Sequence, residues 1–264
     1  MSLLPLFYLK VDPPGAVMKI FKADKQSWIH TAMLSLLFVG TSLFAFSLSG
    51  CSVTDVQDTV PRPVEVEESG EKIYITDQTG KQWEISHAVN KYGMQPENWQ
   101  YGLGPNWFAP LILPKMRCPG DPGYPTGDDF FRNFSTDLVV GAEIKGDARA
   151  YPLAVLYNHE IADENFGGIY VAVAYLPLVD LTAVYSRVID DKVLTLAASG
   201  WTYENTFVLY DRESESLWYH LRGEDGLTCI SGDFKDRKLV EFPSTKTRWR
   251  FWKAEKPHTK FLKF

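Results

Sequence analysis

His159 and Glu160 are adjacent, and they are the residue types best suited to acid–base chemistry in this chain. Histidine titrates near neutral pH, and a neighbouring carboxylate can orient the imidazole or act as a base. Neighbours on a strand point to opposite faces, so both side chains reach one site only if residues 154–161 are helical or turned. Asp163 stands where an HExxH zinc protease needs its second histidine, which excludes that class. A structural histidine with a buried hydrogen bond is the alternative.

Three further polar residues extend this candidate site. Tyr203 and Asn205 follow Ser199-Gly200 and could line a cleft with His159 and Glu160. Asp180 could supply an oxygen ligand to a metal ion held by His159, or it could be a turn residue. The chain has no G-x-S-x-G elbow, phosphate loop or dinucleotide fingerprint, which excludes the common hydrolase and nucleotide-binding classes. These motifs indicate no particular cofactor.

Cys51 indicates a different chemistry, because it ends the sequence Leu-Ser-Gly-Cys behind an apolar run. This resembles the cleavage box of bacterial lipoproteins, in which a peptidase cuts before the cysteine and its thiol receives a diacylglycerol. Residues 1–50 would then be a signal peptide, with a lysine-containing start and no charged residue from 26 to 54. The true start is Met1 or Met18. An uncleaved membrane anchor is the alternative, although residues 32–48 are shorter than the about 20 residues that a span needs.

Lipidation at Cys51 would place the mature protein in the cell envelope, palmitoylated and facing outside the cytoplasm. Ser52, instead of aspartate, favours the outer over the inner membrane by resemblance to known sorting behaviour. Residues 51–70 comprise this cysteine and a polar, acidic, proline-containing segment, which predicts a flexible tether. The membrane is therefore the expected partner, reached through the lipid.

The charge balance limits the other partners. The chain carries 27 Lys and Arg against 33 Asp and Glu, a net charge of −6. Four lysines and two aspartates lie in residues 1–50, so cleavage leaves a net charge of −8. Nucleic acid needs a basic face, and so does electrostatic docking on anionic lipid, so the acidic balance argues against both. A protein or small-molecule partner is left unidentified.

Cys118 and Cys229 are the cysteines besides the lipid acceptor. A compartment outside the cytoplasm permits a disulfide between them, and two independent thiols are the alternative. Neither has a Cys or His neighbour at a zinc-type spacing, which argues against a structural zinc site.

The elements that must position these residues are short. Residues 71–76 and 81–85 alternate around a turn and predict a hairpin, followed by a helix from an N-capping Ser86 to about Lys91, ended near Gly93. Residues 94–127 combine Pro and Gly with aromatic residues, which indicates an irregular but packed loop. We treat residues 71–136 as an N-terminal extension made of this hairpin and loop.

Residues 137–264 form the second part, and they are dense in short strands with turns about every ten residues. This predicts a mainly β, β-rich α+β domain, an antiparallel sandwich or barrel with a few short helices. One helix is expected after an N-capping Thr247, with Trp249, Phe251 and Trp252 covering the sheet. A turn at Asp211-Arg212 is expected to be pinned by an Arg–carboxylate pair that involves Asp211 or Glu215.

These residues also carry a family resemblance. From about Gly102 to the C-terminus the chain resembles the bacterial and archaeal domain-of-unknown-function family 3179, which has no established activity. The motifs are Gly146-Asp147-Ala148-Arg149-Ala150-Tyr151-Pro152-Leu153, Asn158-His159-Glu160-Ile161, Gly167-Gly168, Ser199-Gly200, Tyr203 to Asn205, Tyr210-Asp211-Arg212, Glu215-Ser216-Leu217-Trp218, and Thr247 and Trp252 followed by Pro257-His258-Thr259.

The chain departs from the family at one stretch. Many relatives carry Cys-Pro-Leu-Cys-Gly after the third strand, whereas this chain has Leu176-Pro177-Leu178-Val179-Asp180. Dithiol redox chemistry and soft-metal binding need thiolates, so this protein cannot perform them with this stretch.

Two hypotheses of function follow. The first is a membrane-anchored lipoprotein whose β-rich domain outside the cytoplasm binds a partner or ligand. The second is a metal-binding protein or acid–base enzyme that uses a cleft centred on His159. The sequence leaves open whether the protein is an enzyme.

Overall fold

The computed structural model describes residues 64–69, 72–126 and 137–263, and these belong to one compact unit. The predicted signal peptide, Cys51 and residues 51–63 of the predicted tether lie outside the described residues. No helix in the described ranges is both long and apolar enough to cross a bilayer.

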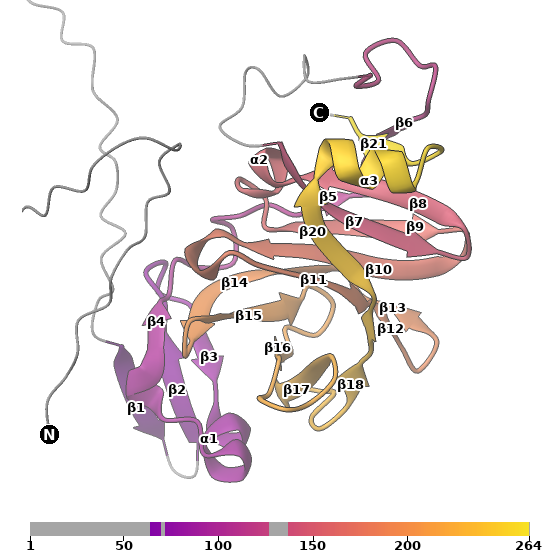
Figure 1. Ribbon diagram of the computed structural model, residues 1–264. Coiled ribbons are helices and arrows are strands. Elements are labelled where there is room, and N and C mark those ends of the chain that lie inside the picture. Colours follow the sequence, from indigo (N-terminus) through magenta and orange to yellow (C-terminus); the bar gives the residue numbers. More distant parts are fainter. Residues whose placement is uncertain (1–63, 70–71, 127–136, 264) are drawn as a thin grey trace, which may run out of the picture. The chain divides into compact units, whose positions relative to one another are not determined.

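Four sheets and a short β-ribbon hold the strands, which make up 48% of the described chain (Figure 1). The six-stranded sheet has the order β18-β17-β16-β15-β14-β4, and every neighbouring pair in it is antiparallel. Its strands are β4 (Trp99–Tyr101), β14 (Leu196–Tyr203), β15 (Thr206–Asp211), β16 (Leu217–Tyr219), β17 (Leu227–Ser231) and β18 (Lys238–Leu239).

Two five-stranded sheets follow. The β9–β11 sheet has the order β19-β11-β10-β9-β5, and the β7–β8 sheet has the order β20-β7-β8-β21-β6. Each contains one parallel pair, β5 with β9 and β8 with β21. The strands are β5 (Leu111–Ile112), β6 (Met116–Arg117), β7 (Leu138–Ile144), β8 (Asp147–Pro152), β9 (Ile161–Phe166), β10 (Ile169–Leu176), β11 (Leu181–Ser186), β19 (Glu241–Phe242), β20 (Ser244–Arg248) and β21 (Lys260–Leu262).

The remaining strands are short. The N-terminal sheet consists of β1 (Glu65–Ser69), β2 (Lys72–Thr76) and β3 (Gln82–Glu84), all antiparallel. A two-stranded ribbon joins β12 (Val188–Ile189) to β13 (Lys192–Val193). The sequence assigned residues 65–69 to the tether. In the structure they pair with β2, and Val64 beside them packs against a hydrophobic cluster of buried residues.

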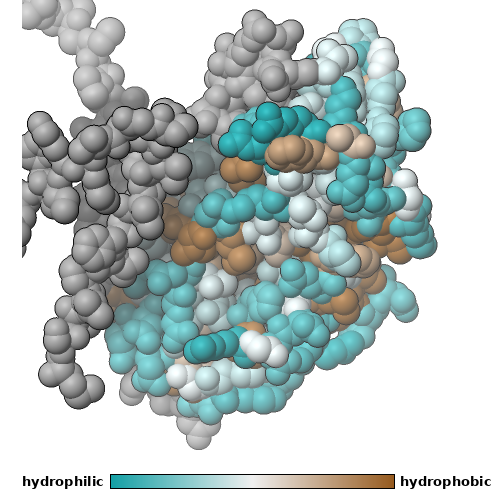
Figure 2. All heavy atoms as spheres, in the orientation of Figure 1, coloured by the Kyte–Doolittle hydropathy of each residue, from teal (hydrophilic) through white to brown (hydrophobic). Residues whose placement is uncertain are grey.

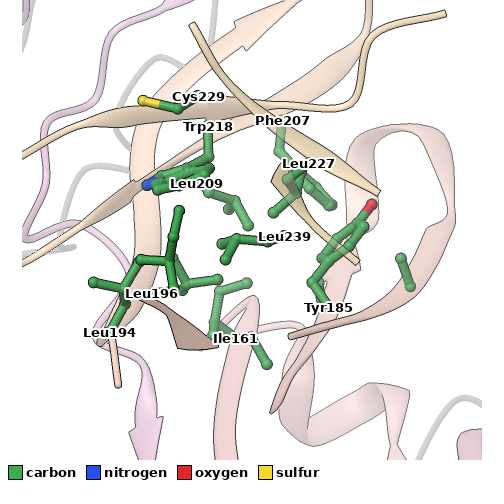
Figure 3. Packing of buried hydrophobic residues seen from close by; sticks show 14 of the residues in the cluster. Ile161, Tyr185, Leu194, Leu196, Phe207, Leu209, Trp218, Leu227, Cys229 and Leu239 are labelled. Atoms are coloured by element: carbon green, nitrogen blue, oxygen red, sulfur yellow. The ribbon is translucent and has the colours of Figure 1, made fainter. Parts of the chain in front are cut away.

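The sheets stack in layers because successive side chains of a strand point to opposite faces. In β15, Phe207 and Leu209 join a core between the six-stranded sheet and the β9–β11 sheet, whereas Val208 and Tyr210 join a core beneath the N-terminal sheet. Figure 3 shows the first of these cores, with Trp218 and Cys229 on the side of the six-stranded sheet. The predicted antiparallel sandwich is therefore confirmed, and none of the sheets formed by the described residues closes into a barrel.

The β9–β11 sheet is buried on both faces in the same way. In β10, Ala172 and Ala174 face the six-stranded sheet, whereas Val171 and Val173 face the β7–β8 sheet. This double burial explains why β10 is almost continuously apolar in the sequence.

The described ranges also contain three α-helices: α1 (Ser86–Tyr92), α2 (Leu153–Leu156) and α3 (Trp249–Glu255). The predicted end of α1 is confirmed, since Gly93 adopts a left-handed conformation and its amide bonds back into the helix. Ser86 is not the N-cap. Its hydroxyl instead accepts a hydrogen bond of 2.9 Å from the amide of Ile73, so a contact with β2 replaces the local cap.

α3 covers the outer face of the β7–β8 sheet (Figure 1), where Trp249 and Trp252 are buried as expected. Phe251 is 55% exposed, so the expectation that it covers the sheet is wrong. Thr247 lies in β20 and does not cap the helix, because its backbone pairs with β7.

Candidate functional site

A pocket of about 140 Å³ opens between the end of α2, the end of β10, the start of the loop after β4, and β14. The lining side chains are apolar or aromatic apart from one carboxyl and one aliphatic hydroxyl. They are Tyr101, Leu103, Trp107, Phe108, Tyr157, Glu160, Leu176, Pro177, Leu178, Gly200, Trp201, Thr202 and Phe207.

Glu160 is held in the pocket wall by its backbone. Its amide donates to the carbonyl of Leu156 at 2.7 Å, and its carbonyl accepts from the amide of Tyr175 at 2.8 Å. Its φ of +57° lies in the left-handed region, which is unfavourable for a side chain other than Gly, Asn or Asp. Strain of this kind persists only where surrounding structure enforces it, and it concentrates at functional sites.

The residue Glu160 is 6% exposed, and its carboxyl lacks a partner among the described residues. Within the described ranges, no hydrogen bond or ion pair reaches either of its oxygens. Burial alone raises the pKa of this carboxyl from an ordinary value of 4.5 to about 8, because an apolar environment disfavours the charged form. Glu160 is therefore mostly protonated at neutral pH.

The other buried carboxylates of the described chain all have partners. Asp77 accepts from Trp83, and Asp211 accepts from Trp218, in both cases at 2.9 Å through the indole nitrogen. Neither carboxylate oxygen of Asp163 has a hydrogen-bond partner among the described residues, but one lies 3.4 Å from the guanidinium of Arg187, so this acid has a cation beside it. Burial raises the pKa of Asp163 to about 8.

The remaining buried carboxylate, Glu164 on β9, belongs to a closed ionic network. Arg149 on β8 lies 2.7 Å from one oxygen of Glu164 and also binds Asp147, while the Tyr151 hydroxyl donates to the other Glu164 oxygen at 3.0 Å. This network joins the β7–β8 and β9–β11 sheets and satisfies its own charges. Glu160 stands apart from it as a buried acid without a cation.

A β-bulge in β14 shapes the opposite wall of the pocket. The register between β14 and β15 shifts between Ala198 and Trp201, so Ser199 and Gly200 form the irregularity. The Ser199 hydroxyl donates to the carbonyl of Val208 and accepts from the amide of Trp201, which fixes the bulge. Gly200 has a φ of +81°, and a Cβ there would lie 2.4 Å from the amide nitrogen of Gly104, so only glycine fits.

The wall also contains buried polar atoms without partners. The indole nitrogen of Trp201 and the hydroxyl of Thr202 have no hydrogen-bond partner among the described residues. Buried polar atoms in native proteins are normally paired, so these two atoms are exceptions within residues that line the pocket.

The rim of the pocket exposes large apolar side chains. Trp107 is 45% exposed and Tyr157 is 59% exposed, and Leu178 beside them is similarly open. The face drawn in Figure 2 is mostly hydrophilic, with smaller hydrophobic patches between the polar side chains. Exposed apolar residues gathered at the rim of a cavity are typical of a binding site.

Residues 176–178, part of the stretch at which the sequence was expected to depart from the family pattern, line this pocket. Leu176 ends β10 and is buried, and Pro177 and Leu178 begin the short 3₁₀-helix η3 (Pro177–Val179). All three line the cavity together with Glu160. These apolar residues therefore form one wall of the pocket.

Of the predicted cleft residues, the structure brings only Glu160 to the pocket. His159 is not among the lining residues, and its Nδ1 bonds to the carbonyl of Ala109 at 2.8 Å. Tyr203 is buried in the core beneath the N-terminal sheet, where its hydroxyl accepts from the amide of Gln95. Asn205 is exposed in the left-handed turn between β14 and β15. The site is thus centred on Glu160 and not on His159.

The two predicted metal ligands, His159 and Asp180, each have another partner: His159 bonds to the carbonyl of Ala109, and Asp180 pairs with a lysine. Asp180 follows η3 in a left-handed conformation, and its carboxylate pairs with the Lys246 ammonium at 2.5 Å. Among the described residues, no group of three His, Cys, Asp or Glu side chains is placed to hold a metal ion.

Cys118 and Cys229 are both free thiols, so the pairing that the sequence left open is absent between these two described residues. Cys118 is exposed next to β6, whereas Cys229 is enclosed in the core of the six-stranded sheet, where burial raises its pKa to about 12. The expected Arg–carboxylate pin is also replaced. Asp211 accepts from Ser214 and Trp218, and Glu215 pairs with a lysine of the N-terminal extension.

Most of the aromatic residues that line the pocket were not predicted as site residues from the sequence. Tyr101, Trp107 and Phe108 belong to the segment predicted as a packed irregular loop, and their clustering was the available signal. Trp201 directly follows the Ser199-Gly200 motif, so its position beside a bulge was readable only after the strand register was known.

A family model described as "Protein of unknown function (DUF3179)" matches residues 132–264, half of the chain. The chain belongs to this family. The match begins later than Gly102, where the sequence resemblance was placed. No curated protein and no solved structure matches the chain.

The family segment supplies only part of the pocket. Glu160, residues 176–178, residues 200–202 and Phe207 lie inside the matched range, whereas residues 101–108 precede it. The leading segment therefore completes the aromatic wall over a family domain that holds the carboxyl.

Proposed function

We propose that this protein is a lipoprotein held in the cell envelope by a diacylglycerol on Cys51, and that its domain outside the cytoplasm binds a small molecule in the Glu160 pocket. The observation that carries the binding role is the buried, partnerless carboxyl of Glu160 in an aromatic cavity. Leaving a polar group in such a place costs free energy, so a ligand that satisfies it gains affinity.

Binding is favoured over catalysis because the pocket lacks a second chemical group. Apart from the tyrosine hydroxyls, Glu160 and Thr202 are the polar side chains in the lining. Acid–base enzymes pair a proton donor with a base or nucleophile whose environment differs. The second candidate is nevertheless an acid–base enzyme with Glu160 as a proton donor, and the raised pKa of about 8 is the observation that favours it.

The anchor would keep this pocket near a membrane. Thirteen residues separate Cys51 from Glu65, the first residue of β1, and a fully extended chain of that length spans at most about 45–50 Å. The lipoprotein box and the uncharged run before it support this part of the proposal.

Metabolic labelling with a fatty acid tests the anchor. Wild-type protein should incorporate label and fractionate with membranes, and Cys51→Ser should do neither, because the acceptor thiol is gone. Labelling that persists in Cys51→Ser would refute the lipoprotein assignment.

Ligand-observed NMR of the full-length protein in nanodiscs, with a set of neutral and charged fragments, tests the pocket. Fragments that bind wild type should bind Trp107→Ala more weakly and Phe251→Ala equally, because both residues are about half exposed but only Trp107 lines the cavity. Equal binding to both variants would contradict the pocket. Conversion of a bound fragment that stops in Glu160→Gln would favour the acid–base enzyme.

A further inference from the structure

Six of the thirteen residues that line the Glu160 pocket are aromatic: Tyr101, Trp107, Phe108, Tyr157, Trp201 and Phe207. The face of an aromatic ring carries negative charge density and attracts cations, most strongly when the cation is shielded from water. An aromatic wall alone also suits neutral apolar ligands. The choice between them depends on the charge that the protein places beside the rings.

That charge is a single carboxyl. Among the described residues, no Lys, Arg or His lines the pocket. The titratable neighbours of Glu160 are the phenols of Tyr101 and Tyr157 in the lining, His159 next in the chain, and Tyr175, whose amide binds the Glu160 carbonyl. None of them shifts the pKa of Glu160, which is raised by burial alone.

The nearest residues of η3 add no free charge. Asp180 follows η3 and is neutralised by Lys246 on β20. The Glu160 carboxyl is therefore the one group in the lining that can become an unbalanced negative charge, and no side chain of the described protein supplies its counter-ion.

We propose that the Glu160 pocket binds an organic cation of the quaternary or tertiary ammonium class. This inference rests on the proposed binding function and names the chemical class of its ligand. The cation supplies the counter-ion that Glu160 lacks, and its alkyl groups pack against the aromatic side chains. An alkylated ammonium carries few or no N–H donors, which fits a lining with few acceptors better than a primary amine or a guanidinium does.

The charge of the whole protein acts in the same direction. The chain has a net charge of −6, and a negative protein raises the local concentration of cations and speeds their association. The exposed indole of Trp107 at the rim offers a first contact on the way in.

Cation binding is linked to proton release. The cation binds the carboxylate, so at a pH below the pKa of Glu160 each binding event displaces a proton. With a pKa of about 8, affinity rises by up to about ninety-fold between pH 6 and pH 9. A neutral ligand that accepts a hydrogen bond from protonated Glu160 gives the opposite dependence, since its affinity falls above pH 8.

Calorimetric titration with choline and with its neutral isostere 3,3-dimethylbutan-1-ol separates these cases. The sample is full-length protein in nanodiscs of phosphatidylethanolamine and phosphatidylglycerol, which carry no choline headgroup, and empty nanodiscs provide the background. We expect choline to bind at least tenfold more tightly than the alcohol at pH 8.5. Repeating the titration at pH 7 in phosphate and in Tris counts the protons, and we expect close to one released.

Matched variants assign the effect to the pocket. Glu160→Gln should lose the preference for choline over the alcohol and release no proton, whereas Glu204→Gln should keep both. Glu204 is a suitable control because it is also left-handed but exposed in the turn after β14. Trp107→Leu should weaken choline binding at least fivefold, and Phe251→Leu should not change it.

The outcomes distinguish this inference from the proposed function. The cation class is overturned if the alcohol binds as tightly as choline and the affinity for choline does not rise with pH. That result leaves the pocket as a binding site. A choline preference retained in Glu160→Gln also overturns it. Binding of neither probe at tens of millimolar overturns both the cation class and the small-molecule function.

Discussion

Replacing Glu160 with glutamine should stabilise the folded protein at high pH. The folded-state pKa of this carboxyl is about 8, and its ordinary value is 4.5. Between these values the unfolded chain is ionised while the folded chain keeps its proton, so the free energy of unfolding falls as pH rises. The full shift corresponds to about 5 kcal/mol, and we expect about 3–5 kcal/mol because the pocket gives the carboxyl some contact with water.

Glutamine is nearly isosteric and stays neutral, so Glu160→Gln removes this pH dependence. The variant and the wild type should have similar stability at pH 5, where Glu160 is protonated in the folded state. By pH 9 the variant should be more stable by the 3–5 kcal/mol derived above. Asp163 also has a raised pKa, but it is present in both proteins and cancels in the difference.

Urea denaturation followed by near-ultraviolet circular dichroism at pH 5, 7 and 9 measures this difference, with Glu204→Gln as the control. Glu204 has the same left-handed backbone but is exposed, so its substitution should leave the pH dependence unchanged. A stability difference that is constant with pH, or a Glu160→Gln protein less stable at pH 9, would refute the claim that the folded carboxyl is buried without a partner.

Three further outcomes follow from the packing. Gly200→Ala should destabilise the protein by about 2–4 kcal/mol in urea denaturation, because a Cβ there overlaps backbone. Gly146→Ala, with open space around it, should cost only about 1 kcal/mol, and equal costs would contradict the bulge geometry. Arg149→Met should cost about 3–5 kcal/mol, since it leaves a buried carboxylate unpaired, and a cost below 1 kcal/mol would argue against the network. In native protein, Cys118 should react with maleimide within minutes and Cys229 only after unfolding; equal reactivity would show that the burial is wrong.

The strand pattern was predictable because apolar runs and the turn residues that bound them are local signals. Residues 138–144 and 170–175 are apolar runs bounded by turn residues, and they form β7 and β10. The left-handed Gly93 at the end of α1 was also readable from its position. The parallel pairs β5–β9 and β8–β21 were not predictable, since β5 and β21 are short and their partners lie far away in the sequence.

The composition of the candidate site could not be predicted from local sequence signals alone. His159 and Glu160 were singled out together, but the turn after α2 sends only Glu160 into the pocket. Which of two neighbouring side chains faces a cavity depends on one backbone angle, here the positive φ of Glu160. Tyr203 and Asn205 were expected beside them, yet the bulge at Ser199-Gly200 shifts the register of β14 and brings Trp201 and Thr202 to the lining instead.

The most direct test of the account is an NMR pH titration of the side-chain carboxyl carbon of Glu160, assigned by its loss in Glu160→Gln. We expect a pKa near 8 in the free protein, raised by burial, and a pKa at least about two units lower in saturating choline. A Glu160 carboxyl that titrates near 4.5, with no change on adding choline, would contradict both the partnerless acid and the cation that completes it.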